Sequence, residues 1–117
     1  MRRIVVLIMA LFLCSTANAG DAGKLVVDRV WTDSIGSHKM AYALVTWENT
    51  SKQTFKSVTV QAIAYDNLGK KIDIADSTFY KSEYGPIKPG FKGTLKILVP
   101  LGNEPFDKMG VSVIARQ

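Results

Sequence analysis

The sequence predicts an all-β protein, an antiparallel immunoglobulin-like β-sandwich of about six to seven strands. Three observations lead to this prediction. Apolar and polar residues alternate along several runs, which is typical of strands with one buried face. Gly, Pro, Asn and Asp residues that favour turns separate these runs at the spacing of a sandwich. The clearest case is Phe55–Ile74, which has the pattern of a strand, a tight turn and a second strand.

The segment Phe55–Ile74 is the pattern around which the rest of the chain is interpreted. Side chains alternate between the two faces of an extended chain, so every second residue from Val58 to Ala64 is expected to face the core. The run ends at the Asp-Asn-Leu-Gly sequence of 66–69. Its Asp and Asn can bond their own backbone, and its Gly accepts a positive φ without steric cost. This combination predicts a β-hairpin.

The first residues, Met1 to Ala19, have the three parts of a secretory signal peptide. Two arginines precede the apolar run Ile4–Leu13, and a small-x-small cleavage pattern follows it. A membrane anchor is one alternative, but the run is about half of the roughly 20 residues that span a bilayer. Lipid attachment at Cys14 is another, and bulky Leu13 argues against it because lipoprotein signals have a small residue there. We therefore expect a periplasmic or secreted protein, cleaved near Ala19.

The segment 20–117 that remains after cleavage has the size of one domain, at 98 residues (117 minus 19). It contains no cysteine, which excludes disulfides, thiol catalysis and cysteine-ligated metals in that segment. Without Arg2 and Arg3, it has 13 basic and 10 acidic side chains, a formal net charge of +3. We attribute this balance to solubilising lysines, and we expect no nucleic-acid binding because the sequence shows no basic stripe. An acidic partner or an anionic envelope surface is the alternative.

Two strands are expected before the hairpin. β-Branched and aromatic residues predict the first at 24–31, and alternation predicts the second at 40–49. The polar segment 32–39 between them is interpreted as a loop. We expect both Trp31 and Trp47 to lie in the core.

The second half of the chain is less regular. In 73–84 the alternation slips around 76–78, as it would at a β-bulge or where a strand changes sheets. Two prolines in 85–90 predict a turn between sheets, because proline removes the N–H that a ladder needs. Two closing strands are expected at 91–101 and 109–116.

Several motifs together resemble a known family. They are Ala62–Asp66 followed by Gly69, the Val-Thr-Trp-Glu-Asn sequence of 45–49 followed by Thr-Ser, the Val-Thr-Val sequence of 58–60, and the Ile-Lys-Pro-Gly sequence of 87–90. This set resembles the FxLYD domains, small immunoglobulin-like sandwiches of bacterial and archaeal exported proteins. The likeness covers roughly 42–99. It implies an accessory or interaction domain without a shared catalytic site, and fold alone does not fix function.

The chain departs from the family pattern in the size of some side chains. Ala62 and Ala64 stand where the family prefers Phe and Leu, and Phe91 stands where an acidic residue commonly follows Pro-Gly. Protein interiors are close-packed, so the volume missing at the two alanines must come from elsewhere. We expect Trp47 to supply it.

Three aromatic residues form the candidate partner-binding site: Phe79, Tyr80 and Tyr84. They cluster where the strand pattern fails, and aromatic residues in irregular segments often anchor contacts because they bury much area at little entropic cost. The alternative is structural. In that interpretation the three rings close an open end of the sandwich and complete its core.

We expect no catalytic residue, no bound metal and no cofactor. His38 is the single histidine and has no partner imidazole or thiol, and the serines lack a nucleophile-elbow context. Asp66, Asp73 and Asp76 could ligate calcium, but their spacing fits no calcium loop. Asn49 begins a glycosylation sequon, which matters only in a host that glycosylates.

These observations predict an exported, non-catalytic interaction or structural module of the bacterial envelope. Its expected partner is another envelope or secreted protein, contacted through a sheet edge or the aromatic segment. We expect no transmembrane span in the chain that remains after cleavage. The alternative is a periplasmic carrier of a small ligand, or a weak enzyme, with a pocket between the two sheets.

Overall fold

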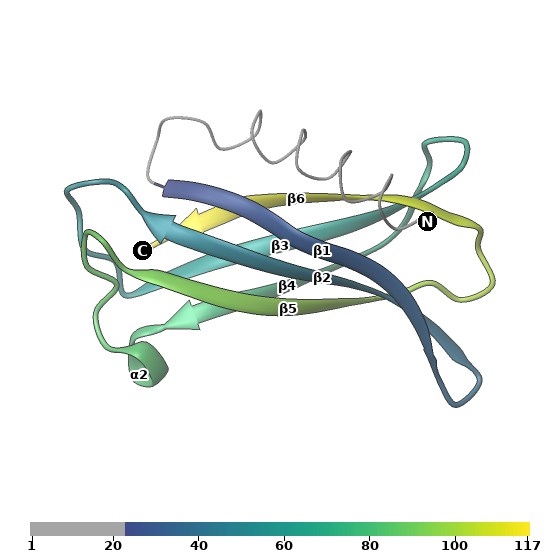
Figure 1. Cartoon of the computed structure of the whole chain (residues 1–117), viewed down its shortest axis with the longest axis horizontal. Coiled ribbons are helices and arrows are strands. Elements are labelled where there is room, and N and C mark those ends of the chain that lie inside the picture. The colour runs from purple at the N-terminus through teal and green to yellow at the C-terminus, as the bar shows by residue number, and fades with distance from the viewer. Residues whose placement is uncertain (1–22) are drawn as a thin grey trace.

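A computed structural model describes residues 23–117 and shows two antiparallel, three-stranded sheets packed face to face (Figure 1). The sheets have the strand orders β1-β2-β5 and β4-β3-β6. The strands are β1 (Gly23–Ile35), β2 (His38–Asn49), β3 (Ser57–Asp66), β4 (Lys71–Tyr80), β5 (Lys92–Pro100) and β6 (Phe106–Arg116). The predicted antiparallel β-sandwich is confirmed. The predicted signal peptide, with Cys14 and the cleavage site at Ala19, lies outside the described residues.

The connections divide the sandwich into two unlike ends (Figure 1). Hairpins join β1 to β2 and β3 to β4 within a sheet, and both turns lie at the same end as the β5–β6 connection. We call this the hairpin end, made of 33–39, 66–73 and 101–108. At the opposite end the β2–β3 and β4–β5 connections cross from one sheet to the other. We call it the α2 end, after the single turn α2 (Lys81–Tyr84), and define it as 50–57, 80–92 and 116–117.

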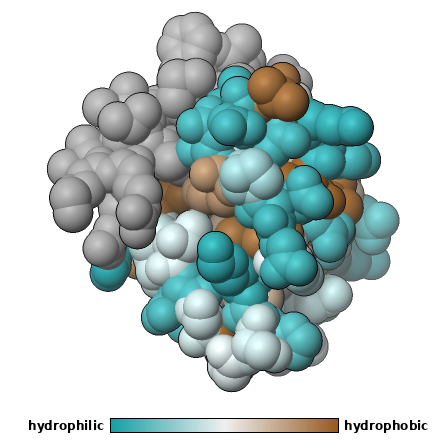
Figure 2. All heavy atoms as spheres, turned by 90° about the vertical axis from the view of Figure 1, so that its right-hand side faces the viewer, coloured by the Kyte–Doolittle hydropathy of each residue, from teal (hydrophilic) through white to brown (hydrophobic). Residues whose placement is uncertain are grey.

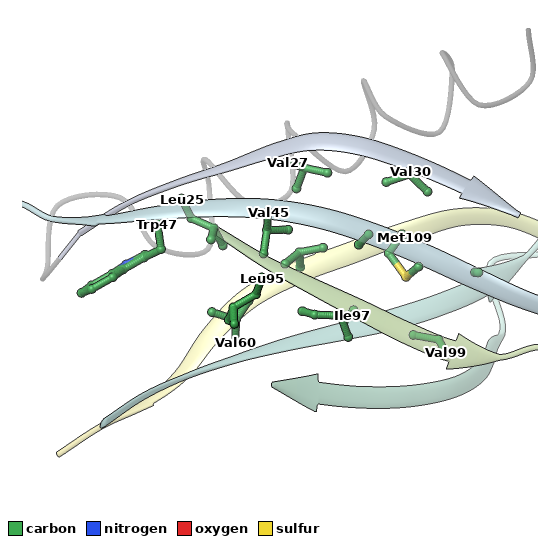
Figure 3. Packing of buried hydrophobic residues seen from close by; sticks show 14 of the residues in the cluster. Leu25, Val27, Val30, Val45, Trp47, Val60, Leu95, Ile97, Val99 and Met109 are labelled. Atoms are coloured by element: carbon green, nitrogen blue, oxygen red, sulfur yellow. The ribbon is translucent and has the colours of Figure 1, made fainter. Parts of the chain in front are cut away.

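The core lies between the sheets and follows the predicted alternation (Figure 3). Every second residue of β3 from Val58 to Ala64 is fully buried, as predicted. From the other sheet, β2 and β5 direct residues such as Val45 and Ile97 into the same layer (Figure 3). Burial of this apolar surface is the main source of stability in such a fold. β6 places its own large side chains beside the small alanines, because Ala62 pairs with Val111 and Ala64 with Met109.

Trp31 is not a core residue, contrary to the sequence prediction. A register shift between Val27 and Arg29 inserts one extra residue, Asp28, into β1. Because side chains alternate with a period of two, such a bulge exchanges the two faces of the strand. Val30 is therefore buried, and Trp31 lies on the outer face of the sheet.

The segment 32–39, predicted as a loop, is mostly strand. β1 continues to Ile35 and pairs there with His38, so that only Gly36 and Ser37 form the turn. Gly36 has a φ of +63°, the left-handed conformation that a two-residue hairpin turn requires and that polar composition alone did not predict.

The ambiguous segment 73–84 is a bulged strand followed by a helical turn. Opposite the β3 register shift between Ala64 and Tyr65, β4 has one extra residue, Ile72, which packs against the core. Ile74 then points outward and is 39% exposed, although it was a candidate inward position. The irregularity is a bulge, one of the two predicted explanations, but it lies at Ile72 and not around 76–78, where β4 pairs with β3 in regular register. The predicted turn at 85–90 does join the two sheets.

Candidate functional site

The three residues of the predicted binding site lie at the end of β4 and in α2, but they do not share one surface. Phe79 is fully buried, whereas 52% of Tyr80 and 46% of Tyr84 are exposed. Adjacent residues of a strand point to opposite faces, so Phe79 faces the core and Tyr80 faces away from it. Tyr80 and Tyr84 are therefore the two members of the set that can touch a partner.

The α2 turn is fixed to two distant segments of the chain. The Lys81 N–H donates to the Lys56 carbonyl at 2.8 Å, and the Lys56 N–H donates to the Gln117 carbonyl at 2.5 Å. The turn ends at Gly85, whose N–H donates to the Lys81 carbonyl at 2.8 Å and whose φ is +74°. A positive φ of this size favours glycine, which has no Cβ. The two tyrosines therefore stand on a backbone held from several sides.

The Tyr84 ring packs against a cluster of other aromatic rings. Its ring centroid lies 5.4 Å from that of Phe79 and 5.9 Å from that of Phe91, both in edge-on geometry. Phe79 and Phe91 are 5.3 Å apart, and each lies within 6.4 Å of Trp47. Edge-on and tilted pairs at these distances are favourable. A Cβ added to Gly93 would lie 2.6 Å from the Phe79 ring, so the cluster also depends on this glycine.

Buried Asn49 joins the loops of the α2 end to one another. Its side-chain amide donates to the carbonyls of Gln53 at 2.8 Å and Ile87 at 3.1 Å. Its Oδ1 accepts from the Ser51 N–H at 3.0 Å and the Ser51 hydroxyl at 2.6 Å. Its backbone bonds to both residues of the turn 90–91. An amide that is 1% exposed and makes these bonds is not accessible to a glycosyltransferase, so the folded domain does not present the sequon at Asn49.

The exposed charged side chains of the α2 end are mainly basic. Within the segments of this end, the acidic side chain is Glu83, and Lys92 lies in register beside Glu48 on the neighbouring strand. The other cations, which we call the basic collar, are all exposed: Lys52, Lys56, Lys81, Lys88 and Arg116. The sequence reasoning missed this collar because its members come from three separate segments, and only the fold brings them to one end.

A hollow of about 210 Å³ lies on the outer face of the β1-β2-β5 sheet and not between the sheets. Two of its polar side chains are already engaged, because the Thr46 hydroxyl donates to the Asp28 carboxylate at 2.5 Å and lies 3.2 Å from the Thr94 hydroxyl. Two lysines and two carboxylates line it and offset each other in charge. The lining residues are Lys24, Val26, Asp28, Thr46, Glu48 and Lys92.

The outer face of the same sheet also carries an aromatic stack. Trp31 and Tyr42 lie parallel, with centroids 5.0 Å apart and an interplanar angle of 4°. The Arg29 guanidinium covers the Trp31 ring at 4.4 Å, and the Lys96 amine lies 5.9 Å from the Tyr42 ring. Stacking and cation–π contacts of this kind stabilise the two rings through partners within the same sheet. We therefore assign the stack a structural role.

The remaining candidates lie at the hairpin end. His38 is exposed beside the β1–β2 turn, and Asp66 is 7% exposed and forms the β3–β4 turn. Its Oδ1 accepts the N–H groups of Leu68 and Lys70, both at 2.9 Å, which is the turn role that its sequence position suggested. Within 23–117, no three His, Cys, Asp or Glu side chains converge as ligands of a metal ion. No helix in that range is long and apolar enough to cross a bilayer.

Comparison with known proteins supports the fold and nothing finer. No family model and no curated protein matches the sequence. Among solved structures, the chain is similar to a β-glucuronidase from glycoside hydrolase family 2, with a TM-score of 0.51 and 12% sequence identity. The match covers 74% of this chain and 11% of the β-glucuronidase chain. At this identity the likeness extends to the β-rich fold alone.

Proposed function

We propose that the chain is an exported, non-catalytic interaction or structural module of the bacterial envelope. Its partner is another envelope or secreted protein, contacted through Tyr80 and Tyr84. The observation that carries this proposal is a pair of half-exposed tyrosines on a turn that hydrogen bonds hold in place. Tyrosine buries a large area at low entropic cost, which makes it a frequent anchor of protein interfaces. The resemblance to the FxLYD domains, which are accessory modules, supports the same class of function.

The sheet edges are less suited to this contact than the tyrosines. The edge strands of the two sheets are β1, β5, β4 and β6, and in two of them, β1 and β4, an aspartate side chain accepts a hydrogen bond from a backbone N–H. Asp33 accepts the Ser34 N–H at 2.8 Å, and Asp73 accepts the Ile74 N–H at 2.8 Å. Charged side chains along an edge also oppose the addition of another strand. The hollow lies on the outside of a sheet, so it does not favour a carrier with a pocket between the sheets.

The proposal is tested by recovery of the partner from the native envelope with the tagged full chain and single variants. Tyr80→Ala should lower recovery about tenfold or more, since loss of an interface anchor typically costs over ~1.4 kcal/mol. Its melting temperature should hardly change, because the ring faces away from the core. Leu68→Ala is the matched control, since it removes an 86% exposed side chain at the opposite end. Equal recovery with Tyr80→Ala and the wild type would exclude this surface.

A further inference from the structure

The two ends of the sandwich differ in charge as well as in construction. The α2 end carries the basic collar together with Tyr80 and Tyr84, and its acidic side chain is Glu83. The hairpin end has charges of both signs in similar number. Its lysines are Lys39, Lys70, Lys71 and Lys108, and its carboxylates are Asp33, Asp66, Asp73, Glu104 and Asp107. The modest net charge of the domain therefore conceals a strongly uneven distribution.

Backbone contacts fix three of the cations relative to the tyrosines. Lys81 follows Tyr80 directly, and its N–H bonds to the Lys56 carbonyl. Arg116 is next to Gln117, whose carbonyl accepts the Lys56 N–H. The positive charges around the tyrosines are therefore part of the folded surface and not of a mobile tail.

Lys88 is placed in the same way. It follows Ile87, which forms an antiparallel bridge with Phe55, the residue before Lys56. The Phe55 N–H donates to the Ile87 carbonyl at 3.0 Å, and the Ile87 N–H donates back at 2.9 Å. Because this bridge joins the two crossing connections, it brings lysines that are distant in sequence to the same end.

We infer that the partner presents an acidic protein surface, whose carboxylates surround the spot that receives Tyr80 and Tyr84. This inference rests on the proposed function and specifies the chemistry of its partner. Complementary charges around a buried anchor steer association and fix orientation. A rim of lysines with an arginine fits carboxylates, and Arg and Tyr are both enriched at protein interfaces.

The side chains of the α2 end favour a protein over a lipid bilayer. Surfaces that insert into a membrane usually present Trp, Phe or Leu. Here the exposed aromatic residues are tyrosines, whose hydroxyl groups seek a hydrogen-bond partner. Leu68 and Ile35, which are 86% and 53% exposed, lie at the opposite, hairpin end.

The experiment places a photoreactive benzophenone side chain at Ser82, which is exposed in α2 between the two tyrosines. The full chain is irradiated in the cells that produce it, and the mass of each adduct distinguishes protein from lipid. Two triple variants are compared with the parent. One is K56Q/K81Q/K88Q in the collar, and the other is K39Q/K70Q/K71Q at the hairpin end. All six lysines are exposed, so both variants should fold and both lose the same net charge.

We expect the collar variant to reduce the protein adduct about tenfold, since three exposed ion pairs each change affinity by up to about fivefold. The hairpin-end variant should stay within about twofold of the parent. Added salt should reduce the yield of the protein adduct in the parent and leave that of the collar variant almost unchanged. The crosslinked segment of the partner should be rich in Asp and Glu.

The possible failures are distinguishable. A protein adduct that is equally strong in both variants, or equally weak in both, overturns the inference and leaves the proposed function standing. An adduct with lipid in place of protein overturns the inference in favour of a membrane surface. If the parent forms no adduct from Ser82 but forms one from a benzophenone at Asn67, the binding surface lies at the hairpin end and both proposals fail.

Discussion

The two ends of this sandwich use different means to hold their loops. At the α2 end the chain crosses between sheets, and its loops are fixed by bonds between residues far apart in sequence. Asn49, for example, bonds to Ile87, 38 residues away. At the hairpin end the Asp66 side chain bonds only two and four residues ahead, to Leu68 and Lys70. The crossing loops are therefore held by long-range polar contacts, whereas the β3–β4 turn is completed by bonds among its own residues.

The difference extends to the surface. Figure 2 looks onto the hairpin end, where mostly hydrophilic residues surround small apolar areas. Leu68 there is 86% exposed and is not part of the core. At the α2 end, by contrast, the aromatic rings extend the core outward to Tyr84. The core therefore positions the Tyr84 ring, whereas it does not position Leu68. Substitutions at matching places of the two ends test this contrast.

The largest expected contrast is between Phe79→Ala and Leu68→Ala. Phe79 is fully buried and contacts Trp47, Tyr84 and Phe91, so its truncation should lower the free energy of unfolding by about 4 kcal/mol. Leu68→Ala should change it by less than about 0.5 kcal/mol, because the side chain is already in water. Urea unfolding of both variants measures the difference. Similar losses in the two variants would mean that Phe79 is not the core residue that the structure shows.

The second contrast compares two asparagines in loops, Asn49→Ala and Asn67→Ala. The Asn49 side chain makes four hydrogen bonds, one each to the Gln53 and Ile87 carbonyls and two to Ser51, and the alanine variant loses all of them. A hydrogen bond contributes about 0.5–1.5 kcal/mol net, so we expect a loss of about 3 kcal/mol. Asn67 is exposed in a turn, and its variant should lose less than about 0.5 kcal/mol.

Urea midpoints again measure the effect, and crosslinking from Ser82 adds a second measurement. If Asn49 positions the α2 end, Asn49→Ala should also reduce the adduct at a urea concentration where the variant is still folded. An Asn49→Ala variant as stable as the wild type would refute the structural role of the amide.

The strands could be predicted largely from alternation, because a sheet with one buried face imposes a period of two on the sequence. The buried positions of β3 and the Asp66 turn were found in this way. The errors arose where one inserted residue shifted the alternation of inward-facing and outward-facing side chains. Asp28 in β1 turned Trp31 outward, and Ile72 in β4 turned Ile74 outward. A bulge has no compositional signature, so local pattern reasoning could not locate it.

The candidate site was harder to predict for a different reason. The aromatic cluster near 79–84 was visible in the sequence, but burial separated Phe79 from Tyr80 and Tyr84. The basic collar was not visible, because the Phe55–Ile87 bridge is what brings Lys56 and Lys88 to the same end of the sandwich. Contacts between residues distant in sequence decide such surfaces, and a single sequence does not encode them in any local pattern.

The smallest of the three contrasts is between Asp66→Ala and Asp66→Asn at the hairpin end. The aspartate accepts two N–H groups, yet the turn also has backbone bonds from Asp66 N–H to the Lys70 carbonyl at 2.8 Å and from Gly69 N–H to the Asp66 carbonyl at 3.0 Å. Residues 67–70 are exposed, so water can replace the lost acceptor. We expect a loss of about 1 kcal/mol.

Asp66→Asn is the matched control, because its side-chain oxygen can still accept both N–H groups. It should recover most of the stability that Asp66→Ala loses, as measured by the urea midpoint. Asp66→Ala should also leave the Ser82 adduct unchanged, since the turn lies at the opposite end from α2. If its loss of stability equalled that of Asn49→Ala, local and long-range anchors would be equivalent in this fold. The contrast between the ends would then lie in their charge alone.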